Sequence, residues 1–467
     1  MLFNSYVFLF LFLPAVLAGW WTLPGRASRL VFLTLASYVF YGWWDYRFVP
    51  LMILSSSADL VAGWLVFRAG SLAWKQLWLA LLLVFNLGLL GFFKYHDFLA
   101  ENWNLLVRAL GLDLELGLLH VVLPVGISFY TFNSISYTID IYRGHIRPTR
   151  SVVAFSAFVA MFPHLVAGPI IRYADMDRQF ANIPERPRSG EMAVGAWFFV
   201  MGMMKKVLVA DVVAAEFVTP LFGQASTLGL LGSWTATLAY TVQIYFDFSG
   251  YSDMAVGLAL FLGLRFPQNF NSPYKAENVS EFWRRWHMSL SFWLRDYLFI
   301  PLGGSRGTRG RTLANLTITM FLGGLWHGAS WTFVLWGLYH GLLLVLHALF
   351  KAAGLVPRSK AVGIAVTFLA VMVGWVFFRS PTLADALSLL SAMAGGRGVE
   401  GLAGAAAIVW RPPTLVLLGA TAAALAAPNT WEIRYPRTRL AAVALGAALF
   451  VCALQFAKPS PFLYFQF

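Results

Sequence analysis

His327 is the residue whose setting most suggests chemistry. It lies in the otherwise apolar run FLGGLWHGASWTFVLWGLYHGL (321–342), with Gly323, Gly324 and Gly328 around it. An ionisable side chain within an apolar run is costly and usually faces a cavity or a partner. Because glycines loosen a helix at membrane depth, we expect His327 to line a cavity, where its imidazole could take a proton from a hydroxyl. The alternative is a structural histidine that bridges helices by hydrogen bonds.

Four other polar or aromatic residues of this region are weaker candidates. Trp326 and Ser330 are candidates for substrate contact, because they lie beside His327 and Ser330 carries the nearest hydroxyl. His340 and His347 are seven residues apart and therefore share one helical face. They lack the double glycine that precedes His327, so a structural role is expected for both.

A second candidate, His287, lies in the segment EFWRRWHMSLSFWLRDYLFIP (281–301). Apolar side chains recur there at helical period: Trp283, Trp286, Leu290, Trp293 and Tyr297. The intervening polar face carries Arg284, His287, Ser291 and Arg295. This pattern predicts one amphipathic helix, and its charges and tryptophans favour the membrane interface over a span. We expect His287 and Ser291 to face the cavity and Arg284 and Arg285 to meet phosphates; the alternative is a helix with lipid-facing arginines.

A third group of candidates lies in YTVQIYFDFSGY (240–251), which continues to Asp253. Gln243, Asp247 and Tyr251 are candidates for binding substrate or donor. Carboxylates are costly to leave unpaired in hydrocarbon, so we expect arginine or histidine partners from neighbouring segments. A structural ion pair of an aspartate with Arg284 or Arg285 is favoured, and a carboxylate that orients a histidine ring is the alternative.

Several kinds of chemistry lack their residues in this chain. The one cysteine, Cys452, provides no disulfide framework or CxxC metal site. The sequence has no HExxH, no GxxxxGK[ST] and no GxSxG motif, so zinc hydrolysis and ATP-driven phosphoryl transfer have no recognisable site. No metal ligand set is predicted. A base without a nucleophile or metal indicates direct transfer, in which His327 deprotonates an acceptor hydroxyl that attacks an acyl donor.

The composition indicates that these residues lie in a membrane protein. Of 467 residues 59% are hydrophobic and only 12% charged, whereas soluble domains carry about 25% charged residues. Apolar runs of about 20 residues recur along the chain, long enough to cross a bilayer. The fold class is therefore an all-α polytopic membrane protein. The net charge of +13 comes from basic residues in short loops, as the positive-inside bias requires, so nucleic acid is not an expected partner.

The apolar runs and the basic loops predict a topology for the first third of the chain. Five spans are expected, with the N-terminus on the outer side and the first run retained as a span rather than cleaved as a signal peptide: 4–21, 30–44, 51–67, 77–93 and 121–141. After Arg150 polar residues interrupt the runs, which favours interfacial or re-entrant pieces. A glycine-rich loop is expected at 395–404, and alanine-rich final spans are expected after Thr414 and Leu440.

Motifs along the whole chain identify a family. The chain resembles the membrane-bound O-acyltransferases, and within them the bacterial alginate O-acetylase branch. The motifs that carry this resemblance are FFKYHDF (92–98), LPVGISFYTFNSISYTIDIYRG (123–144), FPHLVAGPIIRY (162–173), YFDFSGYSDMA (245–255), NFNSPY (269–274), EFWRRWHMSLSFWLRDYLFIPLGG (281–304) and FLGGLWHGASWTFVLWGLYHG (321–341).

The resemblance implies one integral-membrane domain, 1–467, with N-terminal spans (1–150), a motif-bearing core (151–350) and C-terminal spans (351–467). It implies about eleven transmembrane helices plus re-entrant pieces around a funnel, in the bacterial inner membrane. By motif, His327 matches the family's catalytic histidine and His287 its second functional histidine.

The resemblance also implies a reaction and partners. Acetyl groups from cytoplasmic acetyl-CoA would cross the membrane, and a periplasmic SGNH-type acetyltransferase with the polysaccharide machinery would place them on an exopolysaccharide such as alginate. No cofactor is expected to stay bound. Arg284, Arg285 and the basic stretch 306–311 are expected to attract the phosphates of coenzyme A.

Two other functions remain open from the residues alone. A proton-coupled transporter or flippase of a glycan or acyl carrier would use Asp247, His287 and His327 as a proton path. A scaffold that docks secretion partners would tolerate replacement of both histidines.

Overall fold

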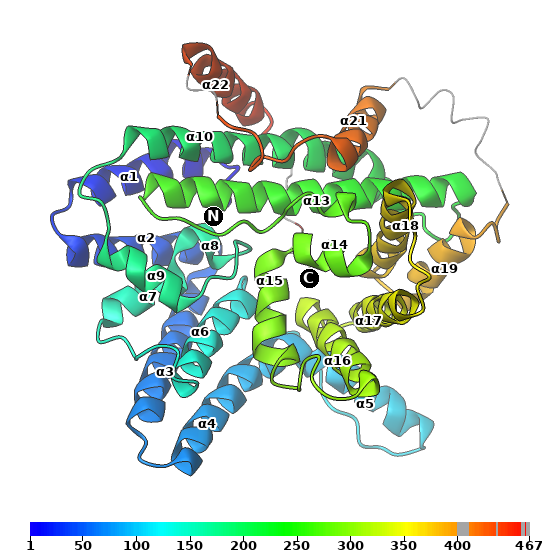
Figure 1. Cartoon of the computed structure of the whole chain (residues 1–467), viewed down its shortest axis with the longest axis horizontal. Coiled ribbons are helices and arrows are strands. Elements are labelled where there is room, and N and C mark those ends of the chain that lie inside the picture. Colours follow the sequence, from blue (N-terminus) through cyan, green and yellow to red (C-terminus); the bar gives the residue numbers. More distant parts are fainter. Residues whose placement is uncertain (399–410, 436–437, 459–462, 464–467) are drawn as a thin grey trace. The chain divides into compact units, whose positions relative to one another are not determined.

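A computed structural model describes residues 1–398, 411–435, 438–458 and Leu463 (Figure 1). The described residues form helices and connecting turns, with no β-strand among them. They divide into two compact units. The first comprises Met1–Met192 and Leu258–Phe266, and the second comprises Ala193–Gly257 and Pro267–Phe467.

The first unit contains a π-helical turn (Phe8–Phe12) and nine α-helices: α1 (Leu13–Thr22), α2 (Arg26–Asp45), α3 (Val49–Arg68), α4 (Leu72–Leu90), α5 (His96–Ala109), α6 (Ile127–Tyr142), α7 (Val152–Ala160), α8 (Phe162–Leu165) and α9 (Tyr173–Ala181). The first four predicted spans are confirmed as helices to within a few residues. Local chemistry sets their starts. Pro50 stands at the first turn of α3, and the Ser71 hydroxyl caps α4 by accepting from the Trp74 backbone N–H.

The fifth predicted span, 121–141, is wrong at its start. Helix α6 begins only at Ile127, directly after Gly126, whose φ of +75° favours glycine. A Cβ on Gly126 would come within 2.6 Å of the Leu165 carbonyl oxygen, so the turn is also closely packed. Nearly all of α6 is buried, and it packs on α3 and α4 (Figure 1). It is therefore an internal helix of this unit.

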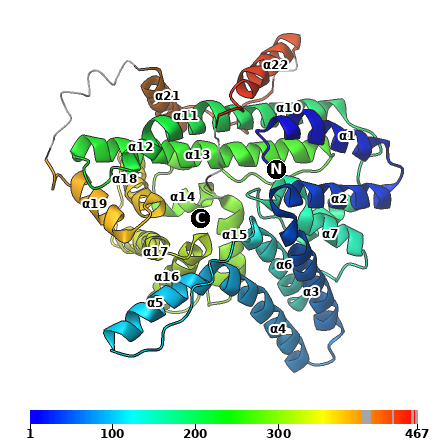
Figure 2. The ribbon, with the colours of Figure 1, turned by 180° about the vertical axis from the view of Figure 1, so that it is seen from behind.

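The second unit holds most of α10 (Ser189–Met204) and α13 (Leu230–Phe261), two helices that run alongside each other (Figures 1 and 2). Its other α-helices are α11 (Asp211–Val213), α12 (Thr219–Phe222), α14 (Val279–Arg285), α15 (Met288–Leu294), α16 (Arg309–His327), α17 (Trp331–Ala352), α18 (Lys360–Arg379), α19 (Leu383–Met393), α21 (Pro412–Ala426) and α22 (Arg439–Ala453). Helix α17 packs against α16 on one side and α18 on the other.

The predicted amphipathic helix over 281–301 is broken in two. Helix α14 ends at Arg285 and α15 begins at Met288, because His287 adopts a left-handed conformation with φ of +42°. A π-helical turn (Arg295–Phe299) follows α15. Three members of the predicted apolar stripe, Trp283, Trp286 and Leu290, are buried within the protein. The expectation of interfacial or re-entrant pieces after Arg150 stays a prediction.

Among the described residues, four helical segments are long and apolar enough to cross a membrane: 26–68, 72–109, 331–352 and 360–379. The chain is therefore a multi-pass membrane protein; the total of about eleven spans stays a prediction. The alanine-rich runs after Thr414 and Leu440 are helical, but α21 and α22 have 15 residues each. At about 1.5 Å per residue such a helix is shorter than the hydrocarbon core of about 30 Å. Of the predicted loop 395–404, positions 399–404 lie outside the described residues.

Candidate active site

His327 is the last residue of α16, and Gly328 ends the helix in an extended conformation. Helices α16 and α17 approach closely where glycines face each other. A Cβ on Gly324 would lie 2.3 Å from the Phe333 carbonyl oxygen, and a Cβ on Gly337 would lie 2.5 Å from the Met320 carbonyl oxygen. The expectation that these glycines loosen the helix is wrong for Gly323 and Gly324, which remain helical. Small residues here allow two helices to pack backbone to backbone, which fixes the position of His327.

Aromatic rings surround the His327 imidazole. Its ring centroid lies 4.9 Å from that of Trp326, 5.0 Å from Trp336 and 5.0 Å from Phe378, each in an edge-to-face arrangement. The residue is 6% exposed. In such an environment the dielectric screening is weak, so a proton transfer or developing charge at the ring is felt strongly. The water-lined cavity that the sequence suggested stays a prediction.

His287 occupies the turn between α14 and α15, and its backbone strain is unusual for a residue with a Cβ. Its Nδ1 accepts a hydrogen bond from the Leu290 backbone N–H at 3.3 Å, which caps α15. A neutral ring must then carry its proton on Nε2. His287 lies outside the four candidate spans, and burial lowers its pKa to about 3. The imidazole is therefore neutral at physiological pH.

Trp326 brings the two histidines together. The indole centroid lies 6.1 Å from the His287 ring and 4.9 Å from the His327 ring, nearly perpendicular to both. The turn after α14 and the end of α16 are separate in the sequence. Each of them thus brings one imidazole into contact with the same indole. The structure places these three predicted site residues, His287, Trp326 and His327, in one cluster.

The two serines have local roles. The Ser330 hydroxyl accepts from the Thr332 backbone N–H at 3.2 Å and lies 3.0 Å from the Thr332 hydroxyl, so Ser330 caps α17. Ser291 is half-buried, one turn after His287, and its backbone N–H donates to the His287 carbonyl at 2.9 Å. Neither contact excludes a substrate role, and neither supplies one.

The arginines differ from each other. Arg284 is exposed and donates to the Ser280 hydroxyl at 3.1 Å. Arg285 is half-buried and forms an ion pair with Glu281 at 2.7 Å, one helical turn away. The expected pairing of Arg284 or Arg285 with an aspartate of α13 is therefore wrong. Of the two, Arg284 is the exposed one, and its contact with a phosphate stays a prediction.

The aspartates of α13 pair instead with two adjacent lysines. Lys206 Nζ lies 2.7 Å from Asp247 Oδ1 and 2.7 Å from Asp211 Oδ1. Lys205 Nζ lies 2.6 Å from Asp253 Oδ2. Both lysines lie in the π-helical turn Lys205–Ala210 after α10. The sequence contained a signal for this pairing. Two consecutive lysines directly follow an apolar run, and buried lysines need carboxylate partners.

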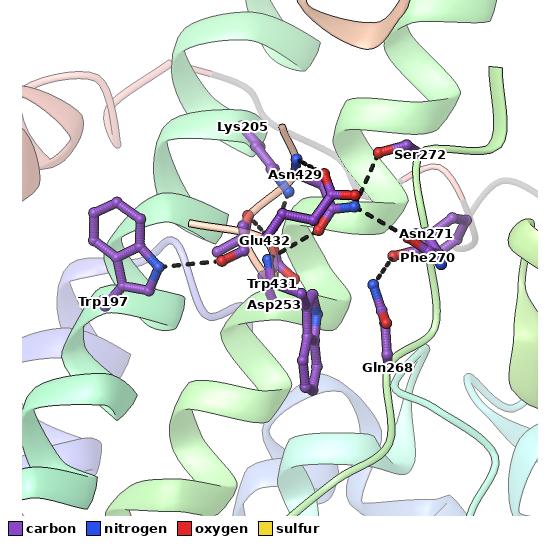
Figure 3. Close-up of polar contacts among 11 residues, drawn as sticks. Trp197, Lys205, Asp253, Gln268, Phe270, Asn271, Ser272, Asn429, Trp431 and Glu432 are labelled. Carbon is purple, nitrogen blue, oxygen red and sulfur yellow. Dashed lines mark hydrogen bonds and ion pairs between the residues drawn. The ribbon is translucent and has the colours of Figure 1, made fainter. Parts of the chain in front are cut away.

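Asp253 also holds a distant segment of the second unit in place (Figure 3). The Thr430 hydroxyl donates to Asp253 Oδ2 at 2.7 Å, and the Trp197 indole N–H donates to the Thr430 carbonyl at 3.4 Å. Beside them, the Asn429 amide donates to the Ser272 hydroxyl at 2.9 Å (Figure 3). This network is structural, and it explains the polar residues at the end of the YFDFSGYSDMA motif.

Asp247 has a comparable structural role. Besides its pair with Lys206, its Oδ2 accepts from the Leu463 backbone N–H at 3.0 Å. No contact between Asp247 and His287 or His327 is found among the described residues, so the carboxylate does not orient either ring there. Gln243 and Tyr251 lie one turn before and one turn after Asp247 on α13. Tyr251 is buried, and Gln243 is half-buried.

Comparison with known proteins identifies the family of this chain. Residues 144–379 match the model of MBOAT, the membrane-bound O-acyltransferase family. The chain is 45% identical over 397 residues to the "Probable alginate O-acetylase AlgI" of Azotobacter vinelandii, covering 84% of this chain and 78% of that protein.

Two further relatives act on other cell-surface polymers, according to their names. The "Peptidoglycan O-acetyltransferase" of Helicobacter pylori is 38% identical over 432 residues, covering 86% of this chain and 81% of its own. The "Teichoic acid D-alanyltransferase" of Streptococcus thermophilus is 31% identical over 281 residues, covering 54% of this chain and 68% of its own. Residues 144–379, which match the family model, contain both histidines and the helices that position them. The chain belongs to the membrane-bound O-acyltransferase family and is an acyltransferase.

Proposed function

We propose that this protein passes acetyl groups across the bacterial inner membrane for O-acetylation of an exopolysaccharide such as alginate, with His327 as the general base. The observation that carries the proposal is the cluster of His287, Trp326 and His327, because it brings two imidazoles into contact with one indole in aromatic surroundings. The relatives named as O-acetylases and O-acetyltransferases support the reaction class.

The reaction needs a base but no covalent enzyme intermediate. His327 accepts the proton of an acceptor hydroxyl while the hydroxyl oxygen attacks the acyl carbonyl of a thioester. The new C–O bond gives a tetrahedral oxyanion, which collapses as the C–S bond breaks. The departing thiolate takes the proton from His327, so the base is regenerated. Neutral His287, with its proton on Nε2, is suited to donate a hydrogen bond and to orient donor or acceptor.

The proposal also names a donor and partners, which are those that the resemblance to the family implies. Acetyl-CoA on the cytoplasmic side is the proposed acyl donor, and the exposed Arg284 with the exposed arginines of 306–311 would attract its phosphates. The proposed final acceptor system is a periplasmic SGNH-type acetyltransferase with the polysaccharide machinery. The proposed topology has a periplasmic N-terminus.

Acetyl transfer from labelled acetyl-CoA tests the proposed function. Inverted membrane vesicles that contain the protein, and matched vesicles without it, are supplied with label on the acetyl group or on the coenzyme A moiety. The proposal predicts that acetyl label enters a protein or glycan acceptor, that coenzyme A label stays outside, and that free thiol is released in equal amount. Movement of intact, unmodified glycan or acyl carrier without thiol release would contradict it and favour a transporter.

A further inference from the structure

His340 is a fully buried histidine whose two ring nitrogens make no hydrogen bond with any described residue. It lies on α17, in the second unit, at 0% exposure. A neutral imidazole has one N–H donor and one acceptor nitrogen, and buried polar atoms in native proteins are nearly always satisfied. The imidazole therefore has hydrogen-bonding capacity that the protein itself does not use.

His164 shows what a structural histidine looks like in this protein. It is equally buried, at 0% exposure, but its Nε2 donates to the Phe158 carbonyl at 2.9 Å. Its Nδ1 lies 3.4 Å from the Asn133 amide nitrogen, which can donate to it. Both nitrogens of His164 thus have a partner within its own unit. His340 lacks such partners among the described residues, so hydrogen bonds within the protein do not account for its imidazole.

The surroundings of His340 contain further donors of the same kind. Its ring centroid lies 5.2 Å from that of Trp283 and 5.0 Å from that of Trp336, and the two indoles lie 5.7 Å apart. The indole N–H groups of Trp283 and Trp336 are also buried without an acceptor among the described residues. An indole nitrogen only donates. Three mutually packed rings therefore offer donors that suit one ligand type, an oxygen that accepts hydrogen bonds.

The cluster lies next to the candidate base. The Trp336 ring is 5.0 Å from His340 and 5.0 Å from His327, so one indole separates the two imidazoles. On the other side, a Cβ at Gly374 would come within 2.8 Å of His340 Nε2. Glycine at 374 therefore allows the backbone of α18 to approach this edge of the imidazole closely.

We propose that His340 and the indole N–H groups of Trp283 and Trp336 bind the oxygen of the transferred acyl group. This inference rests on the proposed acyl transfer. As the acceptor hydroxyl attacks and its proton passes to His327, the carbonyl double bond opens and its electron pair becomes the oxyanion. Donors fixed in a site of weak screening stabilise that oxyanion more than the ground-state carbonyl. When the thiolate leaves, the carbonyl re-forms and the donors release it.

The test compares kinetic constants of purified, reconstituted protein with acetyl-CoA as donor. His340→Phe keeps a ring of similar size and removes both nitrogens, and Trp283→Phe removes an indole N–H without touching His327 directly. His347→Phe, one heptad further along α17 and only half-buried, is the matched control. Losing an oxyanion donor typically lowers kcat by about 10²–10³. We expect such a loss for His340→Phe, with KM nearly unchanged, a smaller loss of the same kind for Trp283→Phe, and wild-type kinetics for the control.

Two further measurements separate this site from a structural one. His340→Gln restores a donor and an acceptor and is expected to recover part of kcat, whereas the thermal unfolding temperature of His340→Phe should equal or exceed that of wild type. A wild-type kcat in His340→Phe would overturn the inference and leave at most a structural water at this site. If His340→Phe does not fold, an unchanged kcat in Trp283→Phe overturns it. Absence of transfer by the wild-type protein would instead refute the proposed function, on which the inference rests.

Discussion

Replacing Lys206 by methionine removes the cation that two carboxylates share. The lysine side chain is 4% exposed, Asp247 is 1% exposed, and Asp211 is 18% exposed. Methionine fills a similar volume without charge, so the change leaves Asp247 as a buried carboxylate with no cation. Asp211 is closer to solvent and can be hydrated. The loss should therefore be dominated by Asp247.

The expected magnitude follows from this burial. Removing one partner of a buried ion pair typically costs about 3–5 kcal/mol in the free energy of unfolding. Lys206→Met should lie near the upper end, because two carboxylates lose one cation. Asp247→Asn should lie near the lower end, because Lys206 keeps Asp211 at 2.7 Å and the asparagine can still accept from the Leu463 backbone N–H. Glu115→Gln, in an exposed ion pair with Arg108, should change the free energy by less than about 1 kcal/mol.

Reversible unfolding in mixed micelles, followed by tryptophan fluorescence, measures these differences. A double variant, Lys206→Met with Asp247→Leu, should recover part of the loss, since removing both charges leaves no unpaired one at that position. The reasoning is refuted if Lys206→Met unfolds within about 1 kcal/mol of wild type. It is also refuted if the double variant is less stable than the sum of the changes measured for Lys206→Met and Asp247→Leu singly predicts.

Three further predictions concern other parts of the molecule. Asp59→Asn should keep the wild-type thermal stability, because the change breaks no ion pair: fully buried Asp59 contacts the Asn86 amide at 3.1 Å, and no described lysine or arginine pairs with it. A large destabilisation would show that Asp59 does pair with a cation. Gly324→Ala should cost about 1–3 kcal/mol, measured by unfolding, because its Cβ would meet the Phe333 carbonyl, whereas Gly310→Ala, with open space around it, should cost nothing. Burial lowers the pKa of His287 to about 3, so on acidification the unfolded chain binds a proton at this histidine before the folded protein does, and stability falls as the pH drops from about 6.5 toward 3. His287→Asn should therefore show a shallower pH dependence of the unfolding temperature. An unchanged slope would contradict this.

The sequence predicted those features that depend on a local pattern. Long apolar runs gave the first four helices of the first unit, because about 20 consecutive apolar residues have few other stable forms in a membrane. The glycine-flanked His327 and the tryptophan-rich segment around His287 marked both histidines as candidates, because each is an ionisable group in apolar surroundings. Their proximity through Trp326 appears only in the packed structure.

Features that depend on tertiary packing were not predictable from the pattern. The left-handed backbone at His287 breaks a helix that the apolar period predicts as continuous, and no glycine marks the break. The sequence offers several basic residues as ion-pair partners for Asp247 and Asp253. The packed structure shows that the partners are Lys206 and Lys205. The unused hydrogen-bonding capacity of His340 appears only when its neighbours are known. In each case the decisive partner is distant in the sequence.

The role of His327 is tested most directly by the single-turnover rate of acyl transfer in reconstituted protein with His327 replaced. His327→Ala and His327→Gln should retain the wild-type unfolding temperature to within a few degrees and bind acetyl-CoA normally. Their transfer rate should fall by about 10²–10⁴, the usual contribution of a general base. Transfer at the wild-type rate by either folded variant would contradict the account.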